Sequence, residues 1–450
     1  MARISNIGAE AQKVNSVKAE KDRIEKEAFF CTTKELSRLG LEQIPTQFQS
    51  HKHLIYSSPA TLAFNSPGAE GFGVNRAGLA VPDSIMLIVA PGCCGRNTSL
   101  ISSMKEYNDR FYYLMMDETD IVTGRHLKKI PKAVEEICSV CPKKPSVVMI
   151  CITCVDALLG TDMERVCKKA EEQVEIPVRP CYMYALTREG RKPPMVHVRQ
   201  SLYSLLEPGK KKGNVVNLLG FFSPLVDDCE IYDLLHSAGV KTIHEISRCK
   251  DYMEYQTMSE ANFNLVLHHE ARFAAEDFHN RLQIPFIELR RLYQIDKIEN
   301  QYHALGNALG VAFYDEKYKK QAEDALEKFR QKCPDASFAI GECLNADPFE
   351  LSLALIRYGF SVPEIYGTIT VENFTYIRSL AKISPETKVF SNMEPTMIYY
   401  DPAKSDVNLA IGKDACYYHP DCPYVMWNGE EQPYGYAGVR RLFEQLLEVV

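Results

Sequence analysis

Short apolar runs alternate along the chain with segments of helical hydrophobic spacing. Several of the apolar runs are continuous, which is typical of parallel strands covered by helices on both faces. The predicted strands cover residues 85–90, 112–116, 146–153, 215–220, 264–267, 285–289, 338–341, 388–390 and 408–412. The predicted helices cover residues 124–138, 163–174, 270–282, 295–310, 314–332 and 349–358. This alternation predicts an α/β fold with doubly wound, mostly parallel sheets.

Two interruptions divide this pattern into predicted domains. Segment 188–208 contains Gly190, Pro193 and Pro194, and a fresh strand begins only after the lysine run at 210–212. A weaker interruption lies near 332–334. The predicted units are a helical arm at 1–35 and α/β domains at 36–208, 209–333 and 334–450. The three domains share an approximate plan, so we expect three similar α/β units rather than a solenoid.

Composition excludes several classes of function. The 450 residues carry a formal net charge of -7, and the basic residues form no long run, so electrostatic binding of nucleic acid is not expected. No stretch reaches the roughly 18 consecutive apolar residues that a membrane span requires. The start of the chain lacks the apolar segment of a signal peptide. We therefore expect a cytoplasmic protein.

Cysteine is unusually abundant, with 15 residues against a single Trp. Disulfides are not the default in a reducing compartment, which favours metal ligation or redox chemistry. The alternative is that many of these cysteines are small buried hydrophobic residues.

Cysteines follow two of the predicted strands directly. Cys93 and Cys94 follow strand 85–90, and Cys154 follows strand 146–153. Ligands of open α/β sheets bind beyond the carboxyl ends of strands, and a nearby helix start favours a thiolate. These three thiols are therefore candidate ligands of an inorganic cluster. The alternative is that they are packed thiols in tight turns.

A second cysteine spacing also suggests a metal. Cys138 and Cys141 form one Cys-x-x-Cys pair, and Cys151 and Cys154 form another, which is a spacing found in zinc sites and four-cysteine clusters. The context argues against such a site, because Cys138 ends a helical pattern and Cys151 lies within an apolar strand. We expect Cys151 to fill the core.

Two polar clusters also follow predicted strands. His268, His269 and Glu270 either line a cleft between domains or, as we favour, start a helix. Glu342 and Cys343 occupy the corresponding place in the third domain, where a buried thiol is the favoured interpretation. The sequence contains no P-loop, dinucleotide-binding or zinc-peptidase motif, so this chain is not expected to bind ATP through a P-loop.

At these residues the chain resembles the nitrogenase component 1 superfamily. Residues 89–95, Val-Ala-Pro-Gly-Cys-Cys-Gly, resemble its His-Gly-Pro-x-Gly-Cys segment, which places Cys94 on a cluster ligand. Residues 153–162 resemble its Thr-Cys-x-x-x-x-Ile-Gly-Asp-Asp segment, which places Cys154 on another. The ending Pro-Tyr-Gly-Tyr-Ala-Gly at 433–438 is similar to the entry into its last helix. The resemblance extends over nearly the whole chain.

The resemblance implies three Rossmann-like domains around a central cleft. It also implies an iron–sulfur cluster, either [4Fe–4S] or a larger P-cluster-like one, shared across a subunit interface and bound in this chain by residues 36–208. The implied partners are a homologous component 1-type subunit, in a homo- or hetero-oligomer, and an ATP-binding iron-protein reductase.

The chain departs from the family pattern in three places. The first cluster cysteine is missing, because residues 64–67 read Phe-Asn-Ser-Pro. The ligand that replaces it could come from a partner subunit, from Cys93, from Cys31 or from an oxygen atom. Subunits that hold the large cofactor also need a middle-domain Cys, which 270–283 lacks, and a His where this chain has Gly435.

Three functions follow. The first is a subunit of a nitrogenase-like reductase complex that relays electrons through its cluster to a substrate site. The second is a scaffold subunit for assembly of a complex metal cofactor. The third is a cluster-free binding protein on the same fold, since fold alone does not establish function.

Overall fold

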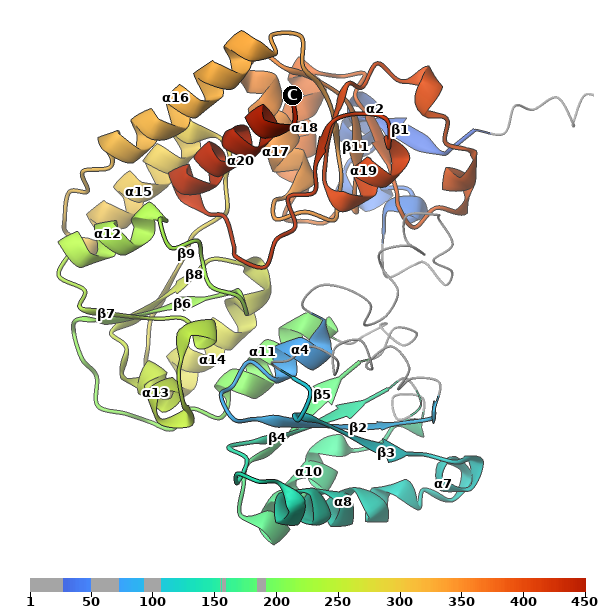
Figure 1. Ribbon diagram of the computed structural model, residues 1–450, viewed down its shortest axis with the longest axis vertical. Coiled ribbons are helices and arrows are strands. Elements are labelled where there is room, and N and C mark those ends of the chain that lie inside the picture. Colours follow the sequence, from blue (N-terminus) through green and yellow to red (C-terminus); the bar gives the residue numbers. More distant parts are fainter. Residues whose placement is uncertain (1–26, 50–72, 93–106, 154, 156–158, 184–191) are drawn as a thin grey trace, which may run out of the picture.

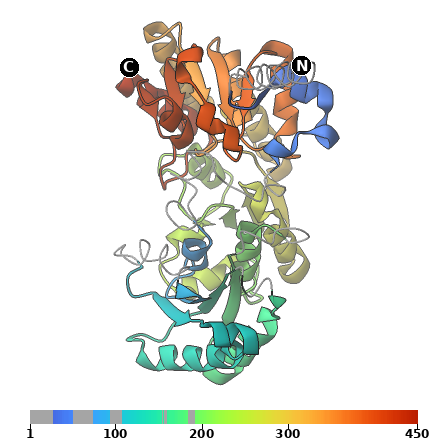
Figure 2. The same cartoon turned by 90° about the vertical axis from the view of Figure 1, so that its right-hand side faces the viewer.

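The computed structural model describes residues 27–49, 73–92, 107–153, 155, 159–183 and 192–450. Three sheets, each covered by helices, follow one another along the molecule (Figure 1). Figure 2 shows the first sheet at one end and the third sheet at the other, with the end of the chain beside the third. The predicted α/β fold with mostly parallel sheets is confirmed.

The first sheet is parallel throughout and has the order β3 (Phe111–Met115), β2 (Ile85–Ala90), β4 (Val148–Ile152), β5 (Val178–Tyr182). Alternate residues of β2 enter two separate apolar clusters: Leu87 packs in the cluster of Val134, and Ile88 in that of Val198. Both faces are buried, which is why this strand reads as a continuous apolar run. The covering helices are α7 (Glu118–Thr123), α8 (His126–Val140) and α10 (Met163–Val174) on one side and α4 (Val74–Gly78) and α11 (Pro194–Tyr203) on the other (Figure 1).

The second sheet is also parallel. Its order is β7 (Thr242–His244), β6 (Val215–Leu219), β8 (Phe263–Val266), β9 (Phe286–Glu288). Its helices are α12 (Glu230–Ser237), α13 (Tyr252–Gln256) and α14 (Arg272–Leu282).

The third sheet has six strands and one antiparallel edge. Its order is β1 (Phe30–Thr32), β12 (Lys388–Phe390), β11 (Ser361–Tyr366), β10 (Ser337–Ile340), β13 (Leu409–Ile411), β14 (Tyr424–Val425), and only β1 runs antiparallel to its neighbour. The remaining α-helices are α2 (Thr33–Leu39), α15 (Ile295–Leu309), α16 (Glu316–Lys332), α17 (Pro348–Arg357), α18 (Phe374–Ile383), α19 (Lys413–Tyr418) and α20 (Gly435–Val449). Short 3₁₀ helices are η1 (Leu41–Gln43), η2 (Thr46–Phe48), η5 (Ile246–Arg248), η6 (Thr257–Glu260), η7 (His269–Ala271), η8 (Pro395–Tyr399) and η9 (Pro402–Lys404).

All nine predicted strands are present, with ends shifted by at most two residues. Five strands were not predicted: β1, β5, β7, β11 and β14. Pro180 interrupts the pattern of β5, which lies at a sheet edge, where the missing N–H is tolerated. Pro363 lies in β11 where its register against β10 shifts. The predicted domain boundaries remain predictions.

None of the helices in the described ranges is both long enough and apolar enough to span a lipid bilayer.

Candidate functional site at the carboxyl ends of the strands

The strands that precede the candidate cluster ligands are neighbours in the first sheet. β2 and β4 pair in parallel, with Val89 opposite Ile152, so both chains leave the sheet at the same edge. Cys93, Cys94 and Cys154 follow these strands and lie outside the described residues.

One buried polar group at this edge lacks a partner. Thr153 directly follows β4, is 2% exposed, and its Oγ1 has no hydrogen-bond partner in the described part of the chain. A buried hydroxyl without a partner destabilises the fold unless some group accepts a hydrogen bond from it. Thiolates and cluster sulfides are acceptors of that kind, so this donor fits an iron–sulfur group ligated by the adjacent Cys154.

Cys31 lies on a different sheet. It is the middle residue of β1, opposite Val389 of β12, at the antiparallel edge of the third sheet. Burial and the neighbouring Glu35 raise the pKa of its thiol to about 11. The described structure therefore does not bring Cys31 to the edge formed by β2 and β4.

The alternative cysteine spacing does not form a metal site among the described residues. Cys151 is fully buried in β4 opposite Cys181, as predicted for a core residue. Cys138 lies near the end of α8, and the Sγ of Cys141 is 3.1 Å from the hydroxyl of Tyr112. Within the described ranges, no three His, Cys, Asp or Glu side chains are placed to bind one ion.

His268, His269 and Glu270 start a helix, as we favoured. His268 Nδ1 accepts a hydrogen bond from the Glu270 N–H at 3.4 Å, at the entry to η7 and α14. The Glu270 carboxylate binds buried Arg199 at 2.8 Å, and that guanidinium also donates to the Gly220 carbonyl. Burial and Arg199 lower the pKa of His268 well below its usual value, so its imidazole is neutral. These groups tie β6, β8 and α11 together.

Cys343 is a partly buried cysteine in a turn that Asp414 holds. Its backbone N–H and that of Glu342 donate to the carboxylate of Asp414, at 3.0 and 2.8 Å. Burial, with Asp414 and Glu342 nearby, raises the pKa of the Cys343 thiol, which therefore stays protonated. The favoured interpretation of a buried thiol is consistent with this environment.

The position after the Pro-Tyr pair is filled by packing that sequence reasoning missed. Gly435 begins α20 with φ +58°, and a Cβ there would lie 1.9 Å from Glu230 Oε1 and 2.2 Å from the Tyr302 hydroxyl. Glu230 begins α12, and its carboxylate accepts from Tyr302 Oη and from the N–H groups of Tyr436 and Ala437, at 2.6, 2.6 and 3.0 Å. Burial raises the pKa of Glu230. The carboxylate caps α20 from another helix, and no side chain fits at residue 435.

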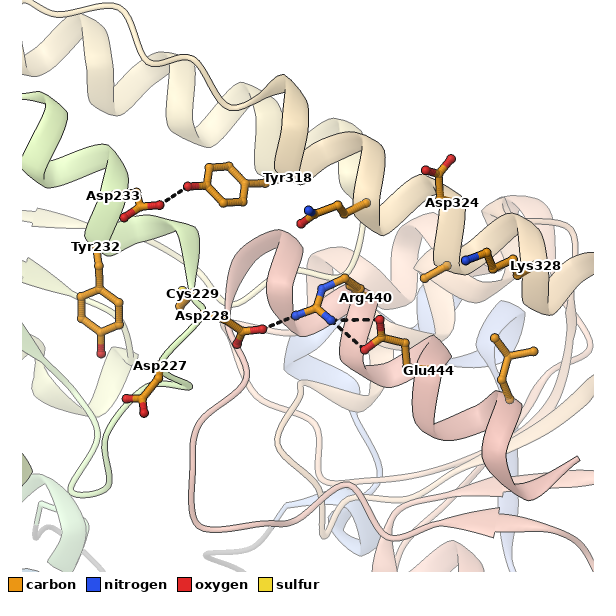
Figure 3. Close-up of a pocket in the computed structure, with 13 residues that line it drawn as sticks. Asp227, Asp228, Cys229, Tyr232, Asp233, Tyr318, Asp324, Lys328, Arg440 and Glu444 are labelled. Carbon is orange, nitrogen blue, oxygen red and sulfur yellow. Dashed lines mark hydrogen bonds and ion pairs between the residues drawn. The ribbon is translucent and has the colours of Figure 1, made fainter.

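A separate polar cavity of about 640 Å³ opens among α12, α16 and α20 (Figure 3). Arg440 bridges Asp228 and Glu444 in its wall, and Tyr318 donates to Asp233. These internal pairings satisfy most of the charges that line the cavity. We therefore interpret the cavity as part of the packing between these helices and not as a ligand site.

Comparison with known proteins decides the family. The family model described as nitrogenase component 1 type oxidoreductase matches residues 70–450. The chain belongs to this family. The resemblance inferred from the cysteine motifs is thereby confirmed.

Curated relatives include several proteins named nitrogenase iron-molybdenum cofactor biosynthesis protein NifE. That of Sinorhizobium fredii (strain NBRC 101917 / NGR234) is 25% identical over 418 residues, which is 87% of this chain and 82% of that protein. That of Nostoc sp. (strain PCC 7120 / SAG 25.82 / UTEX 2576) is 25% identical over 284 residues, 60% of this chain and 58% of that protein. The solved structure of nitrogenase Cp1 at pH 6.5 matches with a TM-score of 0.69 and 18% identity, covering 88% of this chain and 92% of that chain. The fold is therefore that of nitrogenase Cp1.

Proposed function

We propose that this chain is a scaffold subunit on which a metal–sulfur cofactor is assembled and from which it passes to an acceptor protein. Of the functions expected from the sequence, the relatives support this one over electron relay, because those named above are cofactor biosynthesis proteins. The Sinorhizobium alignment covers most of both chains, so the similarity is not confined to one shared domain.

The packing at Gly435 is the structural observation that carries the proposal. The family resemblance places a His here in subunits that hold the finished cofactor, whereas in this chain the Glu230 carboxylate occupies the space. Segment 270–283 also lacks the expected Cys. The chain thus has neither the His nor the Cys that would bind the cofactor permanently. A scaffold that must release its cargo is favoured by the absence of such ligands.

The proposal includes a resident iron–sulfur cluster, distinct from the cargo, because component 1 type oxidoreductases bind such clusters. Cys94 and Cys154 would be its ligands, with Cys93 as a further candidate, and the buried Thr153 hydroxyl would donate to a cluster or thiolate sulfur. When bound, the cluster supplies one-electron transfer. We propose that it is [4Fe–4S] or larger and is shared with a component 1-type subunit, that an ATP-binding iron-protein reductase is a further partner, and that the complex works in the cytoplasm.

Transfer and turnover distinguish a scaffold from an electron-relay subunit. The chain is purified without oxygen together with its component 1-type partner, loaded with metal and sulfide, and mixed with an apo-acceptor. A scaffold transfers metal to the acceptor and reduces no substrate when the reductase and ATP are added. Substrate reduction without transfer would replace the proposal with electron relay.

The cluster is tested separately by iron and acid-labile sulfide per chain. We expect Cys94→Ala and Cys154→Ala to lose most of the iron, while Cys151→Ala, a buried cysteine three residues from Cys154, keeps it. Cys31→Ala tests whether Cys31, on the third sheet, contributes a ligand. Iron-free wild-type protein would instead favour the cluster-free binding protein.

A further inference from the structure

A second polar cavity, of about 370 Å³, lies where segments that belong to the first, second and third sheets meet. Its walls come from α4 and the segment before β2, from the loop after β6 and the residues around η5, and from Glu430. Figure 1 shows α4 between the first sheet and the rest of the molecule. Cys31, the candidate cluster ligand within the described residues, does not line this cavity.

Positive charge predominates in its walls. Arg76, Arg110 and Lys250 line the cavity against two carboxylates, Asp83 and Glu430. Both carboxylates are already engaged, Glu430 with Arg76 at 2.8 Å and Asp83 with Lys143 at 2.7 Å.

Two of these cations have no carboxylate partner. Arg110 donates to neutral oxygens, among them the carbonyls of Ser84 and Leu79 at 2.8 and 2.7 Å. No carboxylate in the described part of the chain lies within ion-pair distance of the Arg110 guanidinium or the Lys250 ammonium. Burial lowers the pKa of Arg110, but an arginine remains protonated. Arg110 and Lys250 are therefore positive charges without a direct ion pair, and Asp83 and Asp109 act on Arg110 only at longer range.

Two serine hydroxyls in the same walls make no hydrogen bond within the described part of the chain, and one of them, Ser247 Oγ, is buried. Ser223 is only 5% exposed, and its hydroxyl makes no hydrogen bond to any described residue. Ser247 Oγ is buried and also unpartnered in the described ranges. A buried hydroxyl is normally paired, so the unpaired Ser247 Oγ is a donor that a bound acceptor would satisfy, and the Ser223 hydroxyl is a second donor in the same wall.

We propose that this cavity binds a small oxyanion, either phosphate or the carboxylates of a small organic acid. Lys250 and Arg110 would neutralise its charge, and the Ser223 and Ser247 hydroxyls would donate hydrogen bonds to its oxygens. The volume is several times the roughly 30 Å³ of a water molecule, which is enough for either anion. The proposal does not depend on the scaffold function, because it uses only Lys250, Arg110 and the two serines, none of which is a candidate cluster ligand.

The test is isothermal titration of the full chain at low salt with two probes, inorganic phosphate and malonate. Lys250→Gln should weaken binding of the preferred probe about tenfold, since a hydrogen bond to a charged group is lost. The matched control is Lys241→Gln, which removes an exposed lysine that does not line the cavity and should bind like wild type. The double variant Ser223→Ala, Ser247→Ala should weaken binding about fivefold without changing charge.

Each result decides the matter. Binding of phosphate alone supports the site and assigns a phosphate or phosphoryl ligand, and binding of malonate alone supports it and assigns an organic acid. Binding of both supports a general oxyanion site. Binding of neither probe, or equal binding by Lys250→Gln and Lys241→Gln, overturns the proposal.

Discussion

Gly435→Ala tests the packing that closes the start of α20. Gly435 has a left-handed backbone and is buried, and the added methyl would overlap Glu230 Oε1 at 1.9 Å and the Tyr302 hydroxyl at 2.2 Å. The carboxylate would have to move away from the two N–H groups that it caps, those of Tyr436 and Ala437.

Two separate costs add in this variant. A left-handed backbone costs an alanine about 1 kcal/mol relative to glycine. Forcing a methyl into filled space costs about 2–3 kcal/mol more, because Glu230 and Tyr302 are themselves buried and hydrogen-bonded. We therefore expect Gly435→Ala to lower the free energy of unfolding by about 3–4 kcal/mol.

The matched control is Gly310→Ala at the end of α15. Gly310 has a similar φ of +71°, but no atom lies within 4 Å of the position of an added Cβ. It should lose only the backbone cost of about 1 kcal/mol. Urea unfolding of both variants measures the difference, and equal losses would refute the claim that Glu230 and Tyr302 fill the space at residue 435.

Three further predictions concern the fold. Burial raises the pKa of fully buried Glu350 from 4.5 to about 7, so between these pH values the native state holds a proton that the unfolded state releases. The free energy of unfolding should therefore fall by about 3 kcal/mol as pH rises from 4.5 to 7. Glu350→Gln should flatten that part of the pH profile measured by urea unfolding. Phe329→Ala should cost about 3–5 kcal/mol in the same assay, because its ring is fully buried among three other phenylalanines, whereas Phe273→Ala, at 44% exposed, should cost far less; similar losses would contradict the packing argument. Thr32→Ala removes the cap of α2 and should cost about 1 kcal/mol of unfolding free energy, and no measurable loss would argue that water replaces the cap.

The local hydrophobic pattern was enough to predict nine of the strands and most of the longer helices, although it missed the interior strand β11 and the last helix, α20. Strands such as β2 and β4 are buried on both faces, so their sequences are continuously apolar, and α10 and α15 carry regular apolar spacing. The pattern did not predict strands that form mainly because a neighbouring strand pairs with them. β1 is three residues long and exists because β12 offers it a partner more than 350 residues away, and Pro180 and Pro363 disguise β5 and β11.

The sequence by itself determined the fold class, the family, and the cysteines that follow adjacent strands, because these depend on residue type and on local order along the chain. Only the tertiary structure decided that Cys31 lies on the third sheet, since strand pairing joins distant segments. The same holds for Glu230, which fills the space beside Gly435 across more than 200 residues of chain. It also holds for the cavity lined by Arg110, Lys250 and Ser247, because burial and charge balance arise only when segments from all three sheets pack together.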